Sequence, residues 1–169
     1  MNLDFASVWE TIADIVPEND ALICGDEVVS WKYYDLNSSK IATALLKAGL
    51  SANSKAGLYL NNSNEYLIAQ NAIFKIGGVP INVNYRYMAE ELIYLLDNSD
   101  SEAVFYHACY SGRIKEIANS LPNIKAWIEI PDGTKSEFHD SLVFTELLES
   151  CEPMERIHRD PNTIYMLYT

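Results

Sequence analysis

The sequence predicts an α/β protein in which alternating βαβ units build a mainly parallel sheet flanked by helices. Three observations support this prediction. Short apolar runs of strand length alternate with longer amphipathic runs from about residue 55 onward. Glycine or a polar turn follows most of the helical runs. The 169 residues are 49% hydrophobic, which suits one domain, or a large part of one, with a substantial core.

An N-terminal helix and a β-hairpin are predicted to precede these units. Apolar side chains recur at helical spacing over residues 5–16, and Pro17 ends that helix. The stretch ALICGDEVVSW predicts two short strands that turn around Gly25. Ser30 is placed to cap the following helix, and Gly49 is placed to end it in the left-handed conformation.

The rest of the chain alternates between predicted strands and helices, as expected for a parallel sheet with right-handed crossovers. The segments PDGTKSEFHD and CEPMERIHRDPN are predicted to be loops. TIYMLYT is expected to be a buried strand, and Asp140 is expected to cap the helix before it. The predicted strands are AGLYL, VPINVN, EAVFY, AWIEI and TIYMLYT, and the helices are NEYLIAQNAIFKIGG, MAEELIYLLDNS, GRIKEIANSL and SLVFTELLES.

Composition excludes several classes of function. The net charge is -12, from 24 acidic and 12 basic residues, which argues against a nucleic-acid or anionic-membrane surface. The amino terminus lacks the basic start and apolar run of a signal peptide, and no stretch reaches the length of a transmembrane helix. Cys24, Cys109 and Cys151 lack zinc-site spacing. A cytoplasmic protein with reduced cysteines and no bound metal is expected.

No complete catalytic or phosphate-binding motif is present in these residues. There is neither a GxGxxG after a strand nor a GxxxxGK[ST]. Gly77-Gly78 follows a helix instead of opening one, so it is interpreted as a helix end. His139-Asp140-Ser141 is interpreted as a surface loop, because consecutive residues cannot adopt triad geometry. Glu90-Glu91 is interpreted as a solvated helix face, so no catalytic residue is assigned.

Tyrosines and one arginine near the strand ends are open to two interpretations each. The tyrosines either close the edges of the core, which is favoured, or line a pocket. Arg86 is either a cation near the ligand-binding edge of the sheet or, as favoured, a structural residue paired with an acidic helix. The tyrosines concerned are Tyr59, Tyr85, Tyr87, Tyr106 and Tyr110.

The stretch FKIGGVPINVNYRYMAEELIYLLDNSDSEAVFY, from Phe74 to Tyr106, resembles the second core segment of AMP-forming acyl-CoA synthetases, within the adenylate-forming superfamily. Upstream, VVSWKYYDLNSSKIATALLKAGL is similar to the first segment of that family. The resemblance extends from about Ala21 to Thr169. In the first segment the matching positions are Ser30, Tyr34, Asp35 and Leu36.

The most specific part of the resemblance is the motif at the end of the chain. In this family a D...I.YT strand leads into a phosphate-binding loop, and Asp160, Ile164, Tyr168 and Thr169 occupy the matching places. The resemblance implies that residues 1–169 are the N-terminal part of an AMP-binding domain, truncated at the start of that loop. Thr169 is therefore the only cofactor-binding residue that it implies. The family's sequence pattern is also matched at Asn82, Asn84 and Arg86, but the resemblance assigns no role to these residues.

For the parent protein, the resemblance implies an acyl-CoA ligase that uses ATP, Mg²⁺ and coenzyme A. It would activate a carboxylic acid as an acyl-adenylate and transfer it to CoA. The motif NVNYRY resembles that of fatty-acid ligases, which implies a fatty acid as the substrate. This chain alone is expected to be inactive and to bind none of these cofactors tightly, and an unprotected edge at TIYMLYT would favour self-association. The alternatives are an adenylation domain that loads a carrier protein and a non-catalytic α/β interaction domain.

Overall fold

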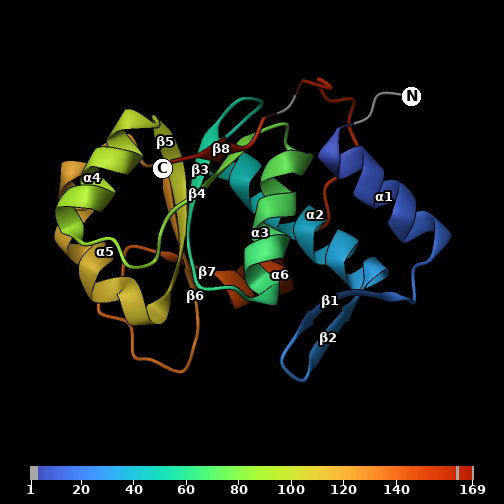
Figure 1. Cartoon of the computed structure of the whole chain (residues 1–169), viewed down its shortest axis with the longest axis horizontal. Coiled ribbons are helices and arrows are strands. Elements are labelled where there is room, and N and C mark those ends of the chain that lie inside the picture. The colour runs from blue at the N-terminus through green and yellow to red at the C-terminus, as the bar shows by residue number, and fades with distance from the viewer. Residues whose placement is uncertain (1–3, 163, 169) are drawn as a thin grey trace.

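A computed structural model describes residues 4–162 and 164–168, with a six-stranded sheet at its centre (Figure 1). The strand order is β7-β6-β5-β3-β4-β8, and each neighbouring pair is parallel. A separate antiparallel hairpin pairs β1 with β2. The predicted fold class is confirmed. The strands are β1 (Asp20–Cys24), β2 (Glu27–Ser30), β3 (Lys55–Tyr59), β4 (Val79–Asn82), β5 (Ser101–His107), β6 (Ala126–Ile130), β7 (Leu142–Val143) and β8 (Met166–Leu167).

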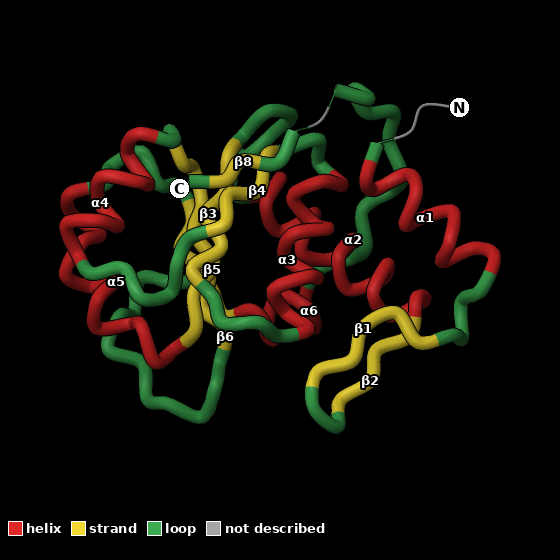
Figure 2. Tube along the Cα trace, viewed as in Figure 1, coloured by secondary structure: helices red, strands yellow, loops and turns green. Residues whose placement is uncertain are grey.

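Helices cover both faces of this sheet. Helices α4 and α5 lie on one face, and α2, α3 and α6 lie on the other. Figure 2 shows α1 and the hairpin as a further layer outside α2 and α3. The helices are α1 (Phe5–Ile15), α2 (Trp31–Lys47), α3 (Asn64–Lys75), α4 (Ala89–Asn98), α5 (Ser111–Ile117) and α6 (Phe144–Ser150), with 3-10 turns at Ala108–Tyr110 and Ala118–Ser120.

The core has two parts, one on each face of the sheet. Because side chains alternate along a strand, Phe105 of β5 faces α2 and α3 while its neighbours Val104 and Tyr106 face α4 and α5. All three side chains are completely buried. Burial of apolar surface on both faces explains why the strands read as short continuous apolar runs.

The predicted helix ends are confirmed where the signal is local. Ser30 accepts a hydrogen bond from the backbone N–H of Tyr33 and caps α2. Gly49 follows α2 with φ of 85°, and Gly77 follows α3 with φ of 72°. The backbone N–H of Gly78 then donates to the carbonyl of Ile73, at 2.9 Å. The interpretation of Gly77-Gly78 as a helix end is therefore correct.

Two sequence predictions are wrong. Asp140 does not cap the last helix, because α6 begins at Phe144 with Val143 as its N-cap residue. The residues between them form β7, whose Leu142 pairs with Ile128 of β6. TIYMLYT is not a buried strand either. Of its described residues, 164–168, Met166–Leu167 is extended and paired, at the edge of the sheet, and Leu167 is 62% exposed.

In the part of the chain that the structure describes, no helix combines the length and the apolar character needed to cross a bilayer. The three cysteines are free, and Cys151 is buried.

The left-handed conformation of Gly77 gives a first test of the fold. Gly77→Ala is expected to lower the free energy of unfolding by about 1 kcal/mol, the usual cost of that conformation for a residue with a Cβ. A Cβ there would lie 3.5 Å from the Cβ of Ala52, so no clash contributes. Urea unfolding measures the change.

Gly77→Asn is the matched control for this substitution. Asparagine tolerates positive φ better than alanine does, so the Asn variant should lose less stability than the Ala variant. An equal or larger loss for the Asn variant would contradict the conformational explanation.

Candidate functional site

The order of the strands identifies one edge of the sheet as the candidate site. Strands β3 and β5 are neighbours, but the helices that follow them, α3 and α5, lie on opposite faces. In open parallel sheets such a switch point opens a crevice at the carboxyl ends of the strands, where ligands bind. The residues that follow β3 and β5 are therefore the first candidates.

Four residues from these two strand ends contact one another. The backbone N–H of Asn61 donates to Nδ1 of His107 at 3.2 Å, and the Tyr110 hydroxyl donates to Oδ1 of Asn61 at 2.9 Å. The rings of Tyr59 and Tyr110 lie with their centroids 4.7 Å apart. These contacts join the turn after β3 to the turn after β5.

His107 is held in one protonation state by this arrangement. Burial lowers the pKa of His107 below its ordinary value, although the charges of Asp132 and Glu65 oppose the change. Its Nδ1 accepts the Asn61 N–H, so the proton of the neutral ring lies on Nε2. Near neutral pH His107 is therefore a hydrogen-bond donor and not a cation.

Asp132, which follows β6, is an anionic group that acts on His107. The Asp132 carboxylate accepts hydrogen bonds from the backbone N–H groups of Cys109, at 3.0 Å, and Thr134, at 2.9 Å. Burial alone would raise the pKa of Asp132, but these hydrogen bonds outweigh it and lower the pKa to about 2. Burial and the neighbouring Asp132 raise the pKa of the Cys109 thiol to about 11, so this cysteine is not a ready nucleophile.

The tyrosines divide between the two interpretations. Tyr59 and Tyr106 are fully buried, which confirms the core interpretation for these two. Arg113 donates to the Tyr59 hydroxyl and to the Tyr87 carbonyl, the latter at 2.8 Å, and so holds the turn after β4 against α5. Tyr87 also lines a cavity of about 340 Å³. The other residues lining that cavity are Glu90, Glu91, Tyr94, Leu95 and Tyr168.

The favoured interpretation of Arg86 is wrong. Among the described residues it forms no ion pair with an acidic helix, and its guanidinium carbon lies 5.4 Å from the ring centroid of Tyr85. Asn84 and Asn82 have structural partners instead. Oδ1 of Asn84 accepts the backbone N–H of Arg86 at 3.0 Å, and Oδ1 of Asn82 accepts the Tyr66 hydroxyl at 3.1 Å. Arg86 as a cation near the ligand-binding edge stays a prediction.

The predicted cofactor-binding role of Thr169 is not tested by the structure. Thr169 lies outside the described residues. Its neighbour Tyr168 donates a hydrogen bond to Asn98 of α4 at 2.9 Å, and Tyr165 lies 3.2 Å from the Tyr66 hydroxyl, oxygen to oxygen. Over residues 4–162 and 164–168, no three His, Cys, Asp or Glu side chains lie close enough together to hold a metal ion.

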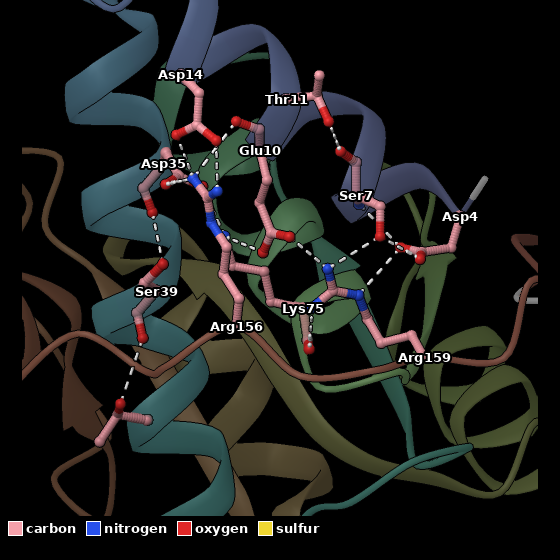
Figure 3. A network of polar contacts seen from close by, with 11 residues as sticks. Asp4, Ser7, Glu10, Thr11, Asp14, Asp35, Ser39, Lys75, Arg156 and Arg159 are labelled. Carbon is pink, nitrogen blue, oxygen red and sulfur yellow. Dashed lines mark hydrogen bonds and ion pairs between the residues drawn. The ribbon is translucent and has the colours of Figure 1, made fainter. Parts of the chain in front are cut away.

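A buried ionic cluster, missed by the sequence analysis, lies between α1, α2, the end of α3 and the segment before β8 (Figure 3). Lys75 is 1% exposed, and its Nζ donates to Glu10 at 2.7 Å and to Asp35 at 2.6 Å. Arg159 is 4% exposed and donates to Asp4 at 3.0 Å and to the second carboxylate oxygen of Glu10 at 2.5 Å. The cluster joins α1, α2 and α3 to the segment before β8.

Comparisons with known proteins agree with this architecture. A family model described as AMP-binding enzyme matches residues 9–169. A medium/long-chain-fatty-acid–CoA/3-oxocholest-4-en-26-oate–CoA ligase of Mycobacterium marinum is 33% identical over 99% of this chain and 32% of its own length. A 3-oxocholest-4-en-26-oate–CoA ligase of Rhodococcus rhodochrous is 33% identical over 100% of this chain and 31% of its own length. The chain thus spans about a third of these relatives.

Solved structures share the fold at lower sequence identity. Coronafacic acid ligase from Pectobacterium brasiliense superposes with a TM-score of 0.86 at 18% identity, covering 98% of this chain and 33% of that one. A fatty acyl CoA synthetase of Mycobacterium tuberculosis gives a TM-score of 0.79 at 23% identity, covering 97% of this chain and 32% of that one.

The protonation state of His107 predicts a dependence of stability on pH. Because its folded-state pKa lies below the unfolded value of about 6.5, the unfolded chain binds the proton first as the pH falls. Stability should therefore decrease as the pH falls from about 6.5 through the folded-state pKa of His107. Urea unfolding at stepped pH measures this slope.

His107→Gln is the control, because a glutamine carbonyl can accept the Asn61 N–H but does not titrate. The pH slope just below 6.5 should flatten in this variant while the slope below pH 4, where Asp132 and the other carboxylates titrate, remains. An unchanged slope in His107→Gln would show that His107 is not the group responsible.

Proposed function

The chain belongs to the AMP-binding enzymes, and on that premise we propose that it forms the first part of an AMP-forming acid–CoA ligase. The observation that carries the proposal is the 33% identity, over nearly the whole chain, to two proteins named as CoA ligases. These relatives are about three times as long as the chain, and we propose that residues 1–169 are the N-terminal part of the AMP-binding domain. Residues 1–169 would then end where a phosphate-binding loop begins, with Thr169 as its first residue.

The proposed reaction of the parent protein has two steps. A substrate carboxylate oxygen attacks the α-phosphorus of Mg-ATP, the bond to pyrophosphate breaks, and an acyl-adenylate forms. The sulfur of coenzyme A then attacks the acyl carbon, a thioester forms, and AMP leaves. The two relatives are named for acids with large apolar bodies, so we propose a fatty or similarly apolar carboxylic acid as the substrate.

The described residues would serve this reaction as a scaffold. The sheet presents the neutral His107 donor at the switch point, and Arg86 supplies a cation after β4, where an anionic substrate is attracted electrostatically. Neither residue supplies a nucleophile or a general base, and the raised thiol pKa excludes Cys109 from that role near neutral pH. The chain alone is therefore proposed to be inactive, with its catalytic groups supplied by the remainder of the parent protein.

ATP–pyrophosphate exchange tests this proposal, because it reports the first step without coenzyme A. The 169-residue chain should give only background exchange. The protein expressed from the source gene, read beyond codon 169, should exchange in the presence of Mg²⁺ and a medium- or long-chain fatty acid. It should also release AMP when coenzyme A is added.

Three results would contradict the proposal or a part of it. Measurable exchange by the 169-residue chain would show that the catalytic groups lie within it. A longer protein that exchanges with amino acids or aryl acids but not fatty acids would remove the proposed substrate class, and transfer to a carrier protein instead of CoA would favour the carrier-loading alternative.

A further inference from the structure

The sheet itself holds strand β8 weakly. Within residues 164–168 the strand has two residues, and there it pairs only with β4, through Ile81↔Met166 and Asn82↔Leu167. Leu167 is 62% exposed. An edge strand of this length buries little surface and gains few hydrogen bonds, so sheet pairing alone cannot determine its position.

Core packing holds the start of the segment before β8, where Cys151 is buried and Met154 packs against the core, but not its end. Residues 151–160 contain no helix or strand. A cavity of about 370 Å³ separates this segment from the starts of β3 and β4, with Ile157 and Ile164 on one wall and Val79 on the other. Both isoleucines are exposed, at 47% and 56%. Close packing therefore does not fix this stretch at the cavity.

Between residues 152 and 160, Arg159 is the buried residue. Its side chain is 1% exposed and lies among groups of α1 and α3 (Figure 3). Besides its bonds to Asp4 and Glu10, it donates to the Ser7 hydroxyl at 3.3 Å and to the Lys75 carbonyl at 3.3 Å. Four acceptors around one buried guanidinium define its position closely, because each acceptor would be left partly unsatisfied if the arginine moved.

The neighbouring arginine provides a contrast. Arg156 bonds both carboxylate oxygens of Asp14, at 2.6 and 2.8 Å, but the two side chains are 45% and 60% exposed. Water competes for such a pair and salt screens it, so the pair constrains the segment less. Arg159 is the stronger anchor of the two.

We propose that Arg159 is a positioning residue for strand β8 and for the segment that follows Tyr168. Met166 lies seven positions after Arg159, so the two lie at most about 25 Å apart along an extended chain. The catalytic consequence rests on the proposed function, because Thr169 would begin the phosphate-binding loop. In that case the buried bonds of Arg159 determine where the loop starts.

Hydrogen exchange on the 169-residue chain tests the positioning itself. Arg159→Lys keeps the charge but replaces a broad fork of donors by one ammonium group, which cannot reach α1 and the Lys75 carbonyl together. Amides of residues 164–168 and of the paired stretch of β4 should exchange about tenfold faster than in the wild type, while those of β5 change little. Ile128→Val, a core variant remote from this segment, is the control for a general loss of stability.

If Arg159→Lys accelerates exchange evenly throughout the sheet, as Ile128→Val should, Arg159 has only a general structural role and the proposal is overturned. Failure of Arg159→Lys to fold would also count against it, since an anchor for one edge strand should not be required for the rest of the sheet. Retained protection at β8 would overturn it directly.

ATP–pyrophosphate exchange in the longer parent protein tests the catalytic consequence. Arg159→Lys should raise the KM for ATP by about tenfold while changing the KM for the acid much less, because only the phosphate loop is displaced. Lys125→Met, which removes the exposed pair with Glu102, should change neither. Equal changes in both KM values would overturn the catalytic consequence. A wild-type parent protein without ATP–pyrophosphate exchange would refute the proposed function. The positioning role of Arg159 would then be tested by hydrogen exchange alone.

Discussion

Burial of charge behind α1 constrains this structure more than any single apolar contact. Lys75 and Arg159 are withdrawn from water together with Asp4 and Glu10, and each ion loses several kcal/mol of hydration. Only mutual pairing offsets that loss, so no member can leave alone without a cost of about 3–5 kcal/mol. Burial would raise the pKa of Asp4, but its bonds from Ser7 and Arg159 lower it instead. The cluster consequently requires α1, the end of α3 and the last segment to be in place at once.

This constraint gives the two edges of the sheet different tasks. Lys75 ends α3, and the cavity beside Arg159 is lined by Lys55 and Val79 at the starts of β3 and β4, so the cluster lies toward the amino edge. His107 ends β5, and Asn61 and Asp132 follow β3 and β6, so these residues lie at the opposite, carboxyl edge. Packing and ion pairs thus secure one edge, and the other is left for ligands, in agreement with the general rule for parallel sheets.

Local signals in the sequence are sufficient to predict most of the fold. They do not predict the pairs between residues far apart in the sequence. Ser30 and Gly77 act within a few residues of themselves, so their roles could be predicted from neighbours alone. Arg159 pairs with Asp4 across 155 positions, and its surroundings in CEPMERIHRDPN read as an ordinary polar connector. The contact between His107 and Asn61 depends on β3 lying beside β5, an order that alternation of strands and helices does not specify. The apolar composition of TIYMLYT predicts a buried strand, but composition does not reveal which strand lies at an edge.

A double-mutant cycle on Glu10 and Arg159 tests the central constraint most directly. Glu10→Gln, Arg159→Met and the double variant are compared by urea unfolding at neutral pH in the 169-residue chain. If the two side chains form one buried unit, the sum of the stability losses in the two single variants should exceed the loss in the double variant. The difference, the coupling energy, should be about 2 kcal/mol or more. Additive losses, with a coupling below about 0.5 kcal/mol, would contradict the account.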